Sequence, residues 1–168
     1  MMEKSKTELK EIKLVGIKAR TSNAREMNPD TALIGANINR YFSNNLGQKI
    51  IGRVKPGVTY CVYADYEADE NGEYTYFVGE EVSSFDDVDP IFDTHIIPKQ
   101  TYVKFNVGPG GMPEICINAW QEIWKMTPET LGGKRNYIAD FEIYDERAAD
   151  YTNTALDIYL GIDKDSGQ

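Results

Sequence analysis

The chain has 168 residues and a mass of 19.0 kDa, which fits one domain that can bury a hydrophobic core without a disulfide or metal. Lys and Arg total 18 against 27 Asp and Glu, so the formal net charge is −9, the wrong sign for direct nucleic-acid binding. The composition is globular, no apolar run is long enough to span a membrane, and the start of the chain is charged. We therefore expect a cytoplasmic protein without membrane contact.

The chain alternates β-patterned segments with two helical ones. Residues 1–8 and 163–168 are polar and aperiodic, which predicts frayed ends. Segments rich in β-branched and aromatic residues predict strands at Lys10 to Arg20, Thr59 to Glu67, Tyr74 to Val82, His95 to Val107, Tyr137 to Tyr144 and Leu156 to Ile162. Asp-Glu-Asn-Gly at 69–72 predicts a hairpin between the second and third strands. Cys61 and Cys116 each lie in an apolar run, which favours small buried thiols over a disulfide or a nucleophile.

The two helical segments have similar openings. Asn28-Pro29-Asp30 combines a capping residue, a proline suited to the first helical position and a carboxylate near the positive helix end. Met112-Pro113-Glu114 opens the second segment in the same way, and Thr127-Pro128 ends it. Apolar residues at helical spacing follow each opening. We expect helices at about 29–45 and 113–126.

The sequence has the marks of a duplication. The two helix openings are 84 residues apart, and Tyr-Phe-Val-Gly at 76–79 recurs as Ile-Tyr-Leu-Gly at 158–161. Each half, at about 9–82 and 92–162, has the order strand, helix, strand, strand. One half cannot cover its own sheet, so we predict a single α+β domain over the whole chain. Its predicted fold is a tandem βαββ repeat with pseudo-twofold symmetry, in which an antiparallel sheet carries two helices that flank a central ligand groove.

A cleft at the interface between two repeats is a natural ligand site. The predicted walls of this cleft are aromatic, and the candidate residues are Trp120, Trp124, Tyr144, Phe77 and Tyr159.

Five motifs occur in a specific order along the chain. They are Tyr-Phe-Val-Gly-Glu-Glu-Val at 76–82, Ile-Pro-Lys-Gln-Thr-Tyr-Val-Lys-Phe at 97–105, Trp120 with Trp124, Asp-Phe-Glu-Ile-Tyr at 140–144, and Asp-Ile-Tyr-Leu at 157–160. In this order, from about Leu9 to Ile162, the chain resembles the GyrI-like superfamily. That superfamily includes the effector-binding domains of AraC-type and multidrug-sensing transcription regulators.

The resemblance implies a groove that binds bulky, planar, often cationic molecules above an acidic residue. The family's Phe-Glu-x-Tyr pattern falls on 141–144 and makes Glu142 that acid. The family's helix tryptophan falls on Trp120 and its last-strand aromatic on Tyr159, whereas Gly161 stands where many relatives have proline. The family's regulators also carry a helix-turn-helix module ahead of this domain, and only eight polar residues precede the fold here. We therefore do not carry over the regulator function.

The residues also support Glu142 without the family. Strand alternation puts Asp140, Glu142 and Tyr144 on one face and Phe141 on the other. That face either meets solvent or lines the groove. An unpaired carboxylate in an aromatic groove costs several kcal/mol to bury, and a cationic ligand relieves that cost. Each aromatic face adds a cation–π attraction of about 0.5–2 kcal/mol for the same ligand.

Several other signals have simpler explanations. His95, the sole histidine, has no partner at metal-ligand or catalytic spacing and is expected to be structural or at the surface. Gly-Pro-Gly-Gly at 108–111 lacks the lysine and spacing of a P-loop and is typical of an entry turn. The acidic pairs at 80–81, 86–87 and 145–146 are typical of solubilising charge, because strand neighbours point to opposite faces. The sequence indicates no metal and no cofactor.

Three functions remain open on the sequence. The first is a binding protein that senses or sequesters hydrophobic, planar, cationic small molecules. The second is a hydrolase that opens cyclopropane rings of DNA-alkylating natural products, as some members of the superfamily do; Glu142 would then orient or activate water while Trp120 and Tyr144 hold the planar substrate. The third is interaction with a protein partner, as in inhibition of DNA gyrase, where the acidic charge mimics DNA.

Overall fold

The structure is a computed structural model, and it describes residues 2–69 and 71–163. The strands in this part of the chain are β1 (Glu3–Leu9), β2 (Ile12–Ser22), β3 (Thr59–Ala64), β4 (Glu73–Glu81), β5 (Asp93–Ile97), β6 (Gln100–Gly110), β7 (Ala139–Tyr144) and β8 (Thr154–Ile162). The helices are α1 (Asn23–Glu26), α2 (Ile34–Ser43), α3 (Glu114–Trp124) and α4 (Pro128–Leu131), with 3-10 turns η1 (Leu46–Lys49) and η2 (Glu146–Ala148). None of these helices has the length and apolar character that crossing a membrane requires.

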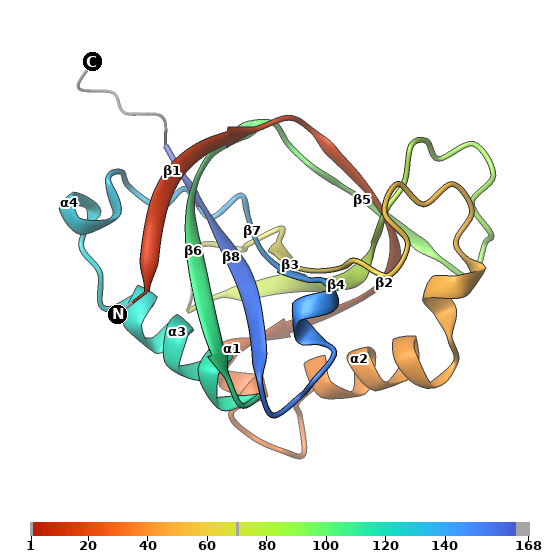
Figure 1. Cartoon of the computed structure of the whole chain (residues 1–168), viewed down its shortest axis with the longest axis horizontal. Coiled ribbons are helices and arrows are strands. Elements are labelled where there is room, and N and C mark those ends of the chain that lie inside the picture. Colours follow the sequence, from red (N-terminus) through yellow and green to blue (C-terminus); the bar gives the residue numbers. More distant parts are fainter. Residues whose placement is uncertain (1, 70, 164–168) are drawn as a thin grey trace.

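The strands form one antiparallel sheet in the order β1-β6-β8-β7-β3-β4-β2-β5. Figure 1 shows that this sheet curls into a barrel-like layer, in which β1 leads into β2 and β5 leads into β6. The two main helices, α2 and α3, lie on the same outer side of that layer.

The two halves of the chain repeat one topology. In the first half β2, α2, β3 and β4 follow one another, and β4 pairs with both β2 and β3. In the second half β6, α3, β7 and β8 follow one another, and β8 pairs with both β6 and β7. The halves meet where β3 pairs with β7, which brings Cys61 opposite Glu142. The predicted α+β fold built from two βαββ units is confirmed.

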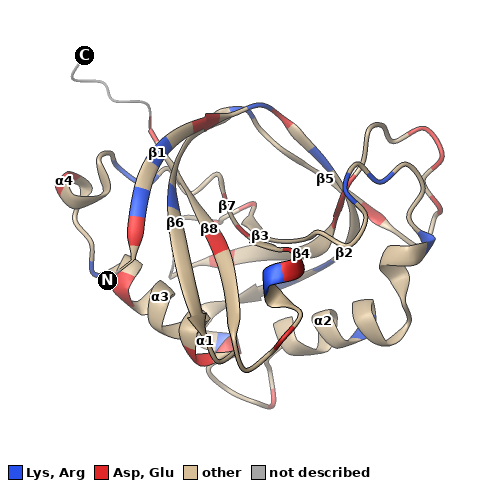
Figure 2. Cartoon of the chain, viewed as in Figure 1, with Lys and Arg blue, Asp and Glu red and all other residues tan. Residues whose placement is uncertain are grey.

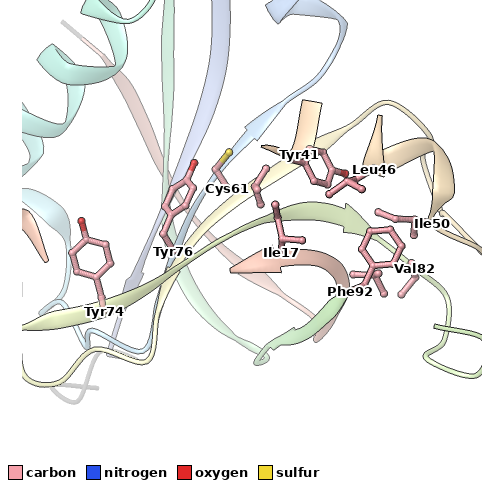
Figure 3. Packing of buried hydrophobic residues seen from close by; sticks show 11 residues of the cluster. Ile17, Tyr41, Leu46, Ile50, Cys61, Tyr74, Tyr76, Val82 and Phe92 are labelled. Carbon is pink, nitrogen blue, oxygen red and sulfur yellow. The ribbon is translucent and has the colours of Figure 1, made fainter. Parts of the chain in front are cut away.

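Apolar side chains fill both faces of the sheet. A cluster that includes Phe77, Tyr102, Phe141 and Tyr159 occupies the inner side of the curl. A second cluster lies between the sheet and the α2 region, and Figure 3 shows its Tyr41 and Leu46 beside Ile17 and Val82. A third lies between the sheet and α3. The face that carries Glu142 is therefore covered by helices rather than by solvent.

The start of the chain differs from its prediction. Residues 3–9 are not frayed, because their backbone pairs with β6 from Glu3 opposite Asn106 to Leu9 opposite Gln100. Their polar side chains gave no β pattern, since β1 is an edge strand with mostly exposed side chains. Of the other predicted frayed end, residues 164–168 lie outside the described residues, as does Glu70 in the predicted hairpin turn.

Other boundaries shift for local reasons. The first helix begins at Ile34 instead of Pro29, because the Asn28 carbonyl accepts from Thr31 and Ala32 and forms a turn there. The strand expected over 95–107 breaks between β5 and β6 and starts at Asp93. The expected strands at 59–67 and 137–144 are shorter, since Asp65 and Tyr137 adopt left-handed backbone angles that a strand does not accommodate. The expected entry turn at 108–111 is largely part of β6.

Candidate ligand-binding site

A groove runs between α2 and α3 above β3 and β7, and it has two adjoining parts. The first, here called lobe 1, has a volume of about 720 Å³, and the second, lobe 2, about 510 Å³. Both lobes share four wall residues: Ile34 of α2, Tyr63 of β3, and Cys116 and Ile117 of α3. Each volume lies within the range of about 300–1,000 Å³ typical of small-molecule sites.

The groove is apolar because the helices turn apolar faces toward it. Along α2, Ile34, Ile38 and Phe42 recur at helical spacing and line lobe 1. The only charged residue of α2 is Arg40, and Figure 2 shows the helix almost free of charge. At the mouth of lobe 1, Phe42 is 53% exposed and Tyr151 65% exposed. Large exposed apolar side chains around a hollow are typical of a binding surface.

Glu142 lies in lobe 1 and is only 2% exposed. Its carboxylate accepts hydrogen bonds from the Trp120 indole Nε1 at 2.6 Å, the Tyr144 hydroxyl at 2.7 Å and the Tyr63 hydroxyl at 3.0 Å. The Cys116 thiol donates a weaker bond at 3.4 Å. All four donors are neutral, and the ion pairs formed in the described part of the chain do not include Glu142. The site therefore holds a buried carboxylate that is solvated by dipoles but not matched by a positive charge.

The groups around Glu142 are held in their neutral, donating forms. Burial, reinforced by the Glu142 charge, raises the pKa of the Tyr63 and Tyr144 hydroxyls well above the ordinary value. The same two causes raise the pKa of the Cys116 thiol, and burial raises that of Cys61. Neither cysteine forms a disulfide. A thiol with a raised pKa is a poor nucleophile, so these residues serve the site as donors and walls.

Asp140, two residues before Glu142, is buried in a different way. It is fully buried, but the Arg135 guanidinium lies 2.8 Å from its carboxylate. The Tyr66 hydroxyl and the Gly161 backbone N–H also donate to it, at 2.6 and 2.8 Å. One strand thus carries a carboxylate with a built-in counter-charge and one without.

Lobe 2 lies beside this network, and aromatic rings dominate its wall. Its residues include Tyr66, Tyr74, Trp120 and Trp124. Trp120 is 9% exposed, whereas Trp124 is 49% exposed at the outer edge. The Tyr63 ring packs edge-on against Trp120, with 5.4 Å between centroids, and continues the aromatic wall toward lobe 1.

The structure gathers most of the predicted site residues in this groove. Glu142 and Tyr144 line lobe 1, and Trp120 and Trp124 line lobe 2. Phe77 and Tyr159 do not lie there. Both belong to the cluster inside the curl of the sheet, because strand alternation directs them to the face opposite Glu142.

The structure also differs from two expectations about which carboxylates are exposed to solvent. The alternative that Glu142 faces solvent is wrong, since helix α3 covers that face. Glu80, expected as solubilising charge, is 4% exposed and pairs with Arg53 at 3.4 Å.

His95 is half-buried in β5, with its ring 5.7 Å from that of Phe77. The described residues contain no cluster of His, Cys, Asp and Glu arranged to hold a metal.

The sequence did not reveal Tyr63 or the α2 residues as parts of the site. Tyr63 lies on the same face of β3 as Cys61, two residues further along, and no sequence pattern linked that strand to Glu142. Only the pairing of β3 with β7 brings them together.

Comparison with known proteins places this chain in a family. Residues 7–162 match the model of Cass2, the integron-associated effector binding protein. The chain belongs to the Cass2 family. It is also 30% identical over 153 residues to YobU of Bacillus subtilis (strain 168), a protein named as a transcriptional regulator; the match covers 90% of this chain and 92% of YobU. The resemblance to GyrI-like effector-binding domains is confirmed.

Solved structures share the fold of this Cass2-family chain. The Vibrio cholerae integron cassette protein VCH_CASS2 aligns over 95% of both chains with a TM-score of 0.75 and 26% identity. SAV2435, solved bound to tetraphenylphosphonium, aligns over 96% of this chain and 94% of its own with a TM-score of 0.75 and 17% identity. The EcmrR C-terminal domain aligns over 98% of this chain and 99% of its own, with a TM-score of 0.59 and 15% identity.

Proposed function

We propose that this Cass2-family protein binds hydrophobic, planar organic cations in the groove between α2 and α3 and so senses or sequesters them. The observation that carries the proposal is Glu142, a carboxylate 2% exposed with four neutral donors and no basic partner among the described residues. Burying such a charge costs free energy, and hydrogen bonds from neutral donors offset only part of that cost. A cation arriving from solution would supply that charge.

The surroundings of Glu142 favour an organic cation over an inorganic one. Tyr63, Tyr76 and Tyr144 line lobe 1 together with apolar side chains of both helices. Aromatic faces attract a diffuse cation, and apolar walls reward the burial of its carbon skeleton. A small metal ion would instead need several oxygen ligands, and lobe 1 offers one buried carboxylate. The SAV2435 complex supports the proposal, because a protein of the same fold is bound to a hydrophobic cation.

Equilibrium binding of tetraphenylphosphonium tests the proposal. The Glu142→Gln variant keeps the shape of the side chain and removes its charge, so we expect affinity to fall by about 10- to 100-fold. Glu146→Gln is the matched control, because Glu146 also lines lobe 1 but is exposed to solvent. Its loss should change the affinity less than about threefold, since solvent screens an exposed charge.

Two results would contradict the proposal. One is a lack of saturable binding to the wild-type protein. The other is an equal effect of the two substitutions, which would mean that the overall acidity of the groove attracts the cation and that burial of Glu142 is irrelevant.

A further inference from the structure

The two lobes differ in the charged side chains that a ligand would meet on their walls. Resting on the function proposed above, we infer that the groove selects elongated cations, whose charged end occupies lobe 1 and whose uncharged aromatic end occupies lobe 2. Lobe 2 would then be a specificity site for a ring system attached to the cation.

The carboxylate in lobe 2 is already used by the fold. Glu26 accepts hydrogen bonds from the Thr21 hydroxyl at 2.6 Å and from the backbone N–H groups of Leu33 and Ile34 at 2.8 and 3.2 Å. Leu33 is the N-cap residue of α2 and has no side-chain cap bond of its own. Glu26 therefore caps α2, and the partial positive charge at the start of that helix offsets part of its negative charge.

The other charge in lobe 2 is positive. Arg135 lines this lobe and forms the 2.8 Å ion pair with Asp140. Its guanidinium carbon also lies 4.3 Å from the centroid of the Tyr137 ring. Because the Asp140 carboxylate is fully buried, this pair is fixed in place, and it puts a guanidinium rather than an unpaired carboxylate on the wall of lobe 2. The cationic end of a ligand is thus directed to lobe 1.

What lobe 2 does offer is aromatic surface. The Tyr66 and Tyr74 rings lie 5.8 Å apart with an interplanar angle of 41°, and Trp120 and Trp124 form the α3 side. The Tyr74 hydroxyl is hydrogen-bonded to Asn23 at 3.0 Å, so its polar end is satisfied. These rings favour a planar group through burial and ring-to-ring contact.

The two lobes adjoin each other. They share Ile34, Tyr63, Cys116 and Ile117 as common walls. Trp120 joins them chemically, because its N–H donates to Glu142 at 2.6 Å while its ring lines lobe 2. A ligand whose aromatic part stacks on the Trp120 ring would place a positive charge next to that part beside the Glu142 carboxylate.

Three probes separate the lobes. They are N-methylquinolinium, the same quinolinium extended through an ethenyl bridge by an unsubstituted phenyl ring, and an uncharged naphthalene analogue of the extended molecule. Calorimetry should give one extended cation per chain and an affinity about tenfold or more above that of the compact cation. Trp124→Ala should remove most of that advantage, about tenfold, and leave the compact cation nearly unaffected.

Phe42→Ala is the matched control. Phe42 is an exposed aromatic residue like Trp124 but lines lobe 1, so its loss should weaken both cations alike. If Trp124→Ala does not fold, Met27→Ala tests the same rim, because Met27 is 86% exposed and lines lobe 2. It should weaken the extended cation alone, by about two- to fivefold.

Distinct results overturn the two ideas. Two extended cations per chain, or equal losses for both cations in Trp124→Ala and in Met27→Ala, would refute the division of the groove while leaving the proposed function intact. If Glu142→Gln binds both cations as tightly as the wild type does, the proposed function itself fails.

Discussion

Glu142→Gln should change the stability of the unliganded protein and its affinity for cations in opposite directions. One carboxylate oxygen accepts from Tyr63, Trp120 and Cys116, and the other accepts from Tyr144 alone. A glutamine can place its carbonyl oxygen at the first position and its NH₂ at the second. The Tyr144 hydroxyl then rotates and accepts, since a hydroxyl can do both. The polar network survives and the uncompensated charge disappears.

The size of both effects follows from the burial of Glu142. An unpaired buried carboxylate costs several kcal/mol in real proteins, and its hydrogen bonds offset part of that cost, which leaves a gain of about 1–2 kcal/mol for glutamine. In a protein of this length about 1 kcal/mol corresponds to 2–4 °C in Tm, so we expect Tm to rise by about 2–8 °C. Two unit charges about 4 Å apart attract by about 4 kcal/mol at an effective dielectric constant of 20, and desolvation of the ligand reduces this to about 1.5–3 kcal/mol of lost affinity.

Thermal melts with and without tetraphenylphosphonium measure both quantities in one assay. The wild type should show a lower Tm alone and a large rise with the cation, and Glu142→Gln should show a higher Tm alone and a small rise. A variant that is less stable than the wild type without ligand would refute the reasoning, because Glu142 would then be a structural hydrogen-bond acceptor whose charge the fold already accommodates.

Four further predictions concern single groups in the structure. Trp120→Phe keeps a six-membered aromatic ring and removes the five-membered ring whose N–H is bound to Glu142 at 2.6 Å, so urea denaturation should show a loss of at least about 1.5–3 kcal/mol; no loss would mean that this bond contributes nothing. Arg135→Leu leaves Asp140 buried without its counter-charge and should cost about 3–5 kcal/mol in the same experiment, and a cost below about 1 kcal/mol would contradict the buried pair. Burial lowers the pKa of His95 below its ordinary value of 6.5, so the contribution of the neutral imidazole to stability is present above that pH and is lost as pH falls. His95→Phe retains an aromatic ring beside Phe77 and should therefore flatten the fall in Tm between about pH 6.5 and 5. An unchanged slope would contradict this. Finally, the wild type should leave a neutral cyclopropane-bearing alkylating compound unconsumed, whereas turnover that disappears in Glu142→Gln would favour the hydrolase alternative.

The sequence predicted the fold because its signals were local. The Pro113 opening gave helix α3 within about two residues, and alternation along 139–144 gave the correct partition of β7 into two faces. It did not predict β1, since the polar side chains of an edge strand carry no apolar pattern. It also placed the start of α2 five residues early, because the cap of that helix comes from Glu26, which precedes the proline turn.

The site was only half predictable for a related reason. Glu142, Trp120 and Tyr144 could be named because the family motif and the helix pattern carry them. Phe77 and Tyr159 were expected in the groove as equivalent aromatics of the two repeats. Because the sheet curls, hydrophobic cores lie on both of its faces. An aromatic residue that points away from the groove is therefore buried inside the curl. Tyr63 joins the site only through the pairing of β3 with β7, a contact between distant segments that no local pattern encodes.

The central claim is that the positive charge of a ligand sits beside Glu142, and a crystal structure with tetraphenylarsonium tests it most directly. Arsenic scatters anomalously, so its position is located independently of the surrounding model. The account predicts one arsenic peak per chain in lobe 1, within about 4–6 Å of the Glu142 carboxylate, the range over which an opposite charge acts on a carboxyl group. A peak in lobe 2 beside Trp124 and Arg135, or on the outer surface, would contradict it.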